Sequence, residues 1–145
     1  MNEEYTTGGC VCGEIRYRFS GDPIISLNCH CNECQSASGT AHTAVIIIPK
    51  DSFELVEGKP TYYAREPEND FCIRRGFCST CGAPVTMLRP ERPKLVYLHA
   101  GSLDSPELYK PSMDIFTAEA LSWDAMAPQL DKFSGMPPVP DDLGR

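Results

Sequence analysis

The amino-acid sequence predicts a mainly β fold with little helix, stabilised by bound zinc. Three observations predict it: short apolar or alternating segments recur along the chain, no longer stretch has helical periodicity, and the cysteines are clustered. The chain has 145 residues and a mass of 16.0 kDa, which is the size of one domain. We expect that domain to span residues 1–126, followed by a proline-rich tail over residues 127–145 that is extended or disordered.

In the first third of the chain the pattern predicts three strands. Polar and apolar residues alternate over residues 14–19, as they do on a half-buried strand. Residues 24–27 form a second apolar segment, which leads directly into a group of cysteines. Residues 43–48 are β-branched or apolar throughout, which is typical of a buried strand, and Pro49 ends it.

Further along the chain the same signals predict five more strands, at residues 53–57, 61–64, 71–77, 85–88 and 95–100. Gly58 ends the first of these, and the next begins directly after Pro60. Helix is expected only as a turn or two, at residues 32–38 and 105–108. The sequence shows no internal repeat and no change of composition that would mark a second domain.

Charge and hydropathy exclude several classes of protein. The net charge is −7 and the isoelectric point is about 4.9, so the basic surface that nucleic acids or anionic lipids require is missing. The longest apolar run is residues 44–48, far short of the ~20 residues that cross a bilayer. The acidic N-terminus has no apolar segment of a secretory signal. We therefore expect a cytoplasmic protein that binds neither nucleic acid nor membrane.

The eight cysteines carry the strongest signal in the sequence. In a reducing cytosol they would not persist as disulfides, so metal ligation is the interpretation that their spacing favours. Apart from Cys72, they fall into three close groups: Cys10 and Cys12; Cys29, Cys31 and Cys34; Cys78 and Cys81. Such spacing lets two thiolates face one ion, and glycine follows Cys12 and Cys81, where a tight turn needs it.

The groups divide most simply into two zinc sites. Four thiolates make a closed structural site, which Cys10, Cys12, Cys78 and Cys81 would supply. Cys29, Cys31 and Cys34 then form a second site with three ligands and one open position, the arrangement of a catalytic zinc. Alternatively, Cys72, His30 or His42 closes the second site and makes it structural. Alternation along residues 71–73 favours a packed thiol for Cys72.

Three blocks of the sequence resemble the signatures of the glutathione-dependent formaldehyde-activating (GFA, CENP-V/GFA) family. They are residues 9–17, 29–39 and 77–82, and a weaker block covers residues 100–104, Pro111 and residues 122–123. The resemblance implies an Mss4-like fold of several coiled antiparallel sheets. It also implies a structural zinc on the first and third blocks and a zinc associated with activity on the middle block. The implied activity is that of a carbon–sulfur lyase joining glutathione and formaldehyde into S-hydroxymethylglutathione.

The sequence departs from the family pattern in two places. Family members often have a histidine after the proline that Pro111 matches, whereas residues 112–115 read Ser-Met-Asp-Ile. Cys72 matches no position of the signature.

An open zinc position suits a thiol substrate such as glutathione. A free thiol has a pKa of about 8.5, so the positive charge of zinc would favour the thiolate that attacks an aldehyde carbon. Neutral contacts to the substrate are expected from Gln35, Ser36, Ser38, Gly39 and Thr40, and cationic contacts from Arg74, Arg75 or Arg89. His30 is expected to point away from the neighbouring cysteine ligands and to have no role, whereas His42 and His99 are expected to have structural roles. Trp123 is expected to pack on the core.

Three classes of function are compatible with the sequence. The first is the zinc-dependent carbon–sulfur lyase, acting on glutathione and formaldehyde or on a related thiol adduct. The second is a non-catalytic binding module stabilised by two zinc ions, since a distant relative with the family's fold is a non-enzymatic partner of small GTPases. The third is a zinc ribbon that binds nucleic acid, which the negative charge disfavours. The sequence predicts no oligomeric state.

Overall fold

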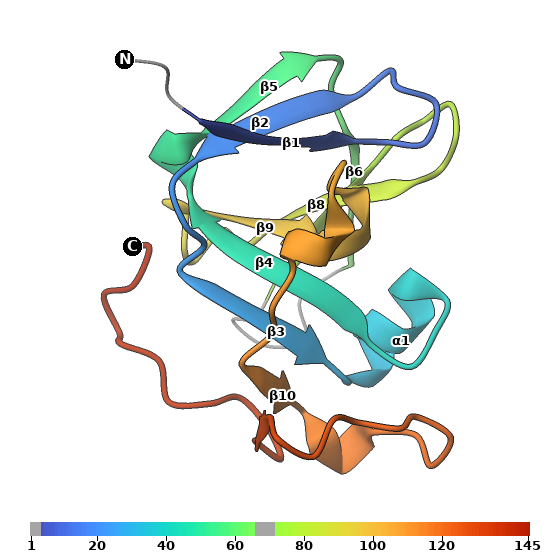
Figure 1. Cartoon of the computed structure of the whole chain (residues 1–145), viewed down its shortest axis with the longest axis vertical. Helices are drawn as coiled ribbons and strands as arrows, with labels where there is room; N and C mark the ends of the chain where they lie inside the picture. Colours follow the sequence, from blue (N-terminus) through green and yellow to red (C-terminus); the bar gives the residue numbers. More distant parts are fainter. Residues whose placement is uncertain (1–3, 66–71) are drawn as a thin grey trace.

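The computed structural model describes residues 4–65 and 72–145, and these residues form a smaller and a larger β-sheet with one α-helix (Figure 1). The smaller sheet has the strand order β1-β2-β5, with bounds Tyr5–Gly9, Arg16–Ser20 and Phe53–Glu57. The larger sheet has the order β11-β10-β3-β4-β9-β8-β7-β6. In chain order its strands are β3 Ile25–Cys29, β4 Thr43–Pro49, β6 Thr61–Ala64, β7 Arg74–Phe77, β8 Pro84–Leu88, β9 Leu95–His99, β10 Met113–Ile115 and β11 Asp131–Lys132.

Helix is as scarce as the sequence predicts. The helix α1 spans Asn32–Ser38, the segment that was expected to form one. The second expected segment is a 3-10 turn, η3. The 3-10 turns of the described residues are η1 Lys50–Ser52, η2 Ala100–Ser102, η3 Pro106–Leu108 and η4 Thr117–Glu119.

The predicted strands match β2 to β9, with small differences at their ends. The main difference is β7, which begins at Arg74, so that Cys72 precedes the strand; Phe71 lies outside the described residues. The strands β1, β10 and β11 were not predicted. In β1 the apolar alternation is missing because the strand ends in two glycines, and a side chain at Gly8 would collide with Tyr17 and with the backbone of Ser102.

The sheets are antiparallel except around β10, which pairs in parallel with β3 and with β11. This parallel register places Asp114 beside Asn28 and Ile115 beside Cys29, next to a cysteine group. A strand of three residues has too little periodicity to be recognised in the sequence.

Strand β4 is the centre of the core, because both of its faces are covered. Ile46 and Ile48 point into the core between the two sheets, together with Tyr17 and Phe19 of the smaller sheet. The alternate residues, Val45 and Ile47, lie in a second core on the other face of the larger sheet. Both of its faces are therefore apolar, as the sequence predicts for a buried strand.

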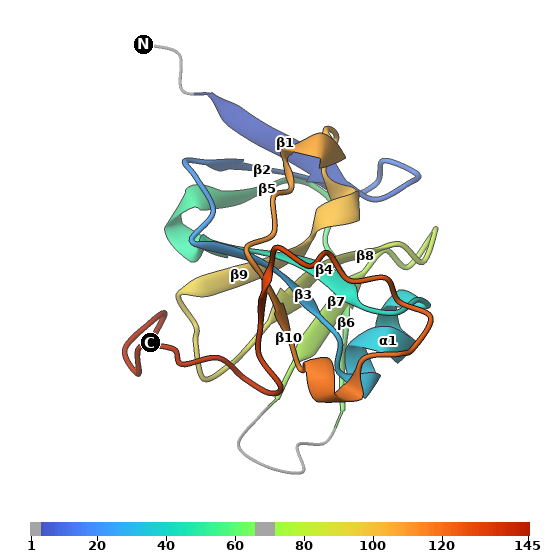
Figure 2. The same cartoon turned by 60° about the horizontal axis from the view of Figure 1, so that its bottom comes forward.

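The C-terminal segment lies along the molecule's own surface (Figure 2). Phe133 and Leu143 pack against the second core, and the amide of Lys94 donates to the carbonyl of Gly144. The structure corrects one expectation here, because Trp123 is 65% exposed and does not pack on the core. It lies in the irregular segment after η4, where no sheet is available to cover it.

Candidate metal centres and the adjoining pocket

The four cysteines predicted to form a closed site lie together. Cys10 and Cys12 are in the turn between β1 and β2, and Cys78 and Cys81 are in the turn between β7 and β8. The sulfur of Cys12 lies 3.6 Å from that of Cys10 and 3.7 Å from that of Cys78. Sulfurs bonded tetrahedrally to one zinc ion are about 3.8 Å apart, so this quartet fits zinc well.

Each turn of the quartet positions its sulfurs with backbone amides. The amide of Ile15 donates to the sulfur of Cys10 at 3.3 Å, and that of Thr80 to the sulfur of Cys78 at 3.4 Å. Gly82 has a φ of 77°, the left-handed conformation that closes the second turn. The amides of Ala83 and Cys12 lower the pKa of Cys81 to about 6, which favours the metal-binding thiolate of this residue.

The quartet joins the two sheets of the fold, because one turn belongs to the smaller sheet and the other to the larger. Cys10 and Cys78 are themselves part of the core between the sheets. A metal ion bound here would therefore fasten one sheet to the other beside their shared core.

Cys29, Cys31 and Cys34 form a second cluster, with their sulfurs within 4.8 Å of one another. Cys29 ends β3, Cys31 is the N-cap of α1, and Cys34 lies in the first turn of that helix. The sulfur of Cys31 accepts a hydrogen bond from the amide of Cys34 at 3.3 Å. The helix thus begins on the cysteine triad and directs its N-terminal amides toward it.

No fourth ligand joins this triad from residues 4–65 or 72–145. His30, His42 and Cys72 were the candidates that the sequence left open, and none of them belongs to the group of sulfurs. The triad therefore has the donor set of a metal site with a free position.

A positive charge lies beside the triad. Arg75, on β7, places its guanidinium 3.9 Å from the sulfur of Cys34 and 3.5 Å from the carboxylate of Glu33. Hydrogen bonds from the thiols of Cys29 and Cys31, together with the charge of Arg75, lower the pKa of Cys34 to about 2. The buried Nε of Arg75 makes no hydrogen bond within the described residues, and its ion-pair partner is the carboxylate of Glu33.

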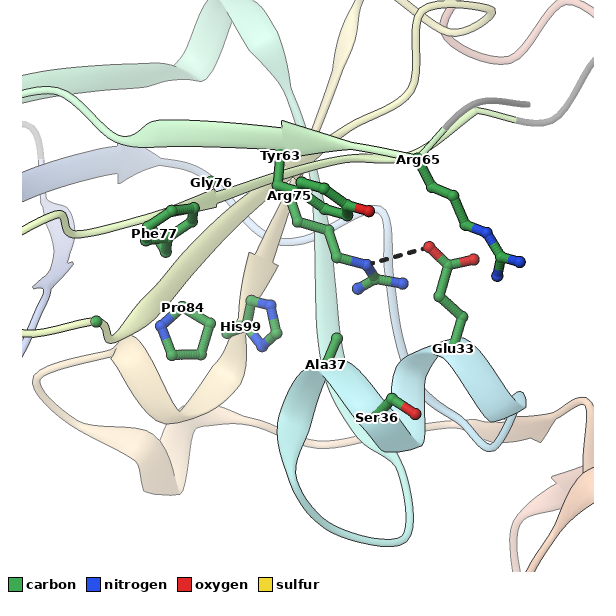
Figure 3. Close-up of a pocket in the computed structure, with 11 residues that line it drawn as sticks. Glu33, Ser36, Ala37, Tyr63, Arg65, Arg75, Gly76, Phe77, Pro84 and His99 are labelled. Atoms are coloured by element: carbon green, nitrogen blue, oxygen red, sulfur yellow. Dashed lines mark ion pairs between the residues drawn. The ribbon is translucent and has the colours of Figure 1, made fainter.

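A pocket of about 370 Å³ lies between α1 and strands β6 to β9, and Arg75 both lines it and contacts Cys34 of the triad (Figure 3). Its lining combines the cations Arg65 and Arg75, the acid Glu33, the neutral polar residues Ser36 and His99, and the apolar or small residues Ala37, Tyr63, Gly76, Phe77, Gly82 and Pro84. Figure 3 shows Arg75 reaching from β7 toward Glu33 on α1. Burial and the nearby Arg75 lower the pKa of His99 to about 4, so this side chain is neutral at physiological pH.

Of the residues predicted to contact a substrate, Ser36 lines the pocket. Gln35 donates to the carbonyls of His30 and Glu119, at 2.8 and 2.9 Å, and holds the start of α1. Ser38 donates to the carbonyl of His42, and Gly39 ends α1 in the left-handed conformation. These three residues serve the helix and its connections in the structure.

Among the arginines proposed as substrate contacts, only Arg75 lines the pocket. Arg74 lies over the ring of Tyr62, and Arg89 pairs with Glu91. Arg65, Tyr63 and His99 line the pocket although the sequence did not predict them there. Neighbouring residues on a strand point to opposite faces, so the sequence could have predicted that only one of Arg74 and Arg75 faces the pocket. Nothing in the sequence shows which face of β7 borders the triad.

The fold and the cysteine clusters define a small β-sheet protein with two candidate thiolate metal centres. Residues 5–119 match the family model of the glutathione-dependent formaldehyde-activating enzyme (GFA), and the chain belongs to this family. The fold resembles a crystal structure of a Rhodobacter sphaeroides protein, with a TM-score of 0.56 at 18% identity, covering 72% of this chain and 96% of that one. A comparison with curated proteins finds no significant match.

None of the helices in the described parts of the chain is long and apolar enough to span a membrane.

Proposed function

We propose that this protein is a carbon–sulfur lyase that acts on the adduct of glutathione and formaldehyde, S-hydroxymethylglutathione, or on a related thiol adduct. Zinc is the proposed ion at both cysteine clusters, one per cluster. The observation that carries the proposal is the three-cysteine cluster with a free position, contacted by Arg75, a cation that also lines a pocket. Family membership supports the reaction class.

The reaction joins a thiol sulfur to an aldehyde carbon, and the thiol proton ends on the former carbonyl oxygen. Zinc bound by the triad would supply the positive charge that keeps a substrate thiol in its thiolate form near neutral pH. The chain's own part is to position the three sulfurs and to favour the thiolate of Cys34. The amide of Cys34 donates to the sulfur of Cys31, and the charge of Arg75 helps to lower the pKa of Cys34.

The pocket residues would bind and orient the rest of the substrate. A glutathione-like thiol has two carboxylates, and Arg65 and Arg75 are the cations that line the pocket. Neutral His99 and Ser36 can exchange hydrogen bonds with a peptide or with the aldehyde oxygen without adding charge. The rings of Tyr63 and Phe77 provide apolar contact area.

The test is the rate of adduct formation from glutathione and formaldehyde, followed by proton NMR with the metal content measured in the same sample. We expect a rate that exceeds the uncatalysed addition and rises in proportion to protein concentration. If the fully metal-loaded protein gives only the uncatalysed rate, the lyase proposal is wrong. Glutathione binding without turnover would then favour the alternative, a non-catalytic binding module.

Replacing Arg75 by glutamine should weaken glutathione binding about tenfold or more. A hydrogen bond to a charged group is worth about 1.5–3 kcal/mol, and every 1.4 kcal/mol is a factor of ten in affinity. In the rate assay the weaker binding should appear as a KM for glutathione that is about tenfold higher or more. The metal content should not change, because Arg75 lies beside the triad and is not one of its ligands.

The matched control is Arg74→Gln, on the same strand but over the ring of Tyr62. A small thiol without carboxylates, such as 2-mercaptoethanol, is the second control, since it cannot pair with Arg75. Equal losses for both thiols, or for both variants, would contradict a carboxylate-binding role of Arg75.

A further inference from the structure

A third cluster of metal-ligating side chains lies outside the cysteine groups. It consists of His30, His42 and Asp124, with one ligand atom of each within 4.8 Å of the others. His30 follows Cys29 and precedes Cys31, so that its side chain points away from theirs in an extended segment. We propose that these three residues bind a divalent first-row transition-metal ion, at a site separate from both cysteine clusters.

The spacing of the ligand atoms fits a shared ion. The Oδ2 atom of Asp124 lies 3.1 Å from Nδ1 of His30 and 3.4 Å from Nδ1 of His42. Nitrogen and oxygen ligands about 2.0–2.1 Å from one zinc ion are about 3.3 Å apart in tetrahedral geometry. Both measured distances lie close to that value.

The hydrogen bonds of His30 leave Nδ1 for a cation. Its Nε2 atom lies 2.8 Å from the buried carboxylate of Asp114, which also accepts from Lys132 at 2.7 Å and from Asn28 at 3.1 Å. A carboxylate with these donors is ionised and can only accept, so Nε2 carries the proton. With the proton on Nε2, the lone pair of Nδ1 is free to bind a cation.

Nδ1 of His30 and the carboxylate of Asp124 are two acceptors close together, which a cation bound to both would stabilise. Nδ1 of His30 is buried and has no hydrogen-bond partner among the described residues, although Asp124 is only 3.1 Å away, because that oxygen lies off the direction of a ring N–H bond. One divalent ion coordinated by all three residues would give Nδ1 of His30 the partner it lacks.

The surroundings of His30 match those of histidines that bind metal. Such a histidine usually donates its other ring N–H to a carboxylate, which sets the tautomer and orients the ring. Asp114 is in this position and is held by Lys132 from β11.

The donor set indicates the class of ion. Two imidazoles and one carboxylate suit zinc, iron, cobalt or nickel rather than magnesium or calcium, which prefer all-oxygen sites. The side chain of His30 is fully buried, whereas those of Asp124 and His42 are 13% and 31% exposed. The site is therefore anchored in the core and reachable from solvent on the side of His42.

Trp123 gives a direct test, because it is the only tryptophan of the chain and precedes Asp124. Tag-free protein with zinc-loaded cysteine clusters is titrated with Co²⁺, and the quenching of Trp123 fluorescence is followed together with cobalt uptake by metal analysis. We expect saturable quenching and one additional metal equivalent per chain. In His42→Gln and in Asp124→Asn the apparent Kd should rise at least tenfold, since even removing a supporting residue costs 10–100-fold in affinity.

The matched control is Asp131→Asn, an exposed acid on β11 outside the cluster, which should bind like the unmodified chain. Circular dichroism verifies that each variant is folded, and a constant zinc content verifies that the cysteine clusters are intact. The proposal would be overturned if the unmodified chain showed no saturable cobalt binding. It would also be overturned if His42→Gln and Asp124→Asn bound cobalt with the same affinity as the unmodified chain. The thiol chemistry plays no part in this readout, so failure of the lyase proposal would leave the result unaffected.

Discussion

Replacing Cys78 by serine is expected to unfold the protein. The variant removes one of four thiolates from the quartet that joins the smaller sheet to the larger. A structural zinc contributes on the order of 10–16 kcal/mol, whereas a domain of this size is stable by only about 5–15 kcal/mol. The remaining apolar core cannot replace a contribution of that size.

Cys78 is also buried in the core between the sheets, so an unpaired serine hydroxyl there adds a further penalty. The measurement is far-ultraviolet circular dichroism with metal analysis, and the variant should lose both its β-sheet signal and its cooperative thermal transition. Cys72→Ser is the matched control, because Cys72 lies outside both cysteine clusters. A Cys78→Ser chain that remains folded would show that the quartet is not the structural site.

Much of the fold could be predicted because its signals are local. Strand β5 ends before Gly58 and β6 begins after Pro60, so turn residues define both boundaries in the sequence and in the structure. Strand β10 could not be predicted in this way. Its three residues are ordered by parallel pairing with β3, and that partner is more than eighty positions away in the sequence.

The same distinction applies to the candidate sites. The cysteine groups were recognisable because the spacing within each group is short, and the structure brings the predicted sulfurs together. The pocket was not recognisable as a unit, since Arg75 and His99 reach it from different strands. Asp124 and His30 are far apart in the sequence and are close in a fold in which β10 pairs with β3, so the third cluster has no signature in the sequence.

Replacing Cys34 by serine should have the opposite outcome to Cys78→Ser: a folded chain that loses one metal ion and its activity. The triad lies within a segment of six residues at the junction of β3 and α1. A metal bound there closes only a short loop and joins no distant parts of the fold, so it adds little to the stability of the sheets. The far-ultraviolet spectrum should therefore stay close to that of the unmodified chain.

The rate of adduct formation should fall at least about 100-fold toward the uncatalysed rate, because a metal that stabilises charge contributes several kcal/mol and each 1.4 kcal/mol is a factor of ten. Metal analysis and the NMR assay on one sample separate the two effects, and Cys72→Ser again serves as the cysteine control. The expected pair of results is one ion lost with the fold kept for Cys34→Ser, and the fold lost for Cys78→Ser. Equal unfolding of both variants would mean that the triad is a structural site as well, and a folded Cys34→Ser chain with full activity would exclude the triad from the reaction.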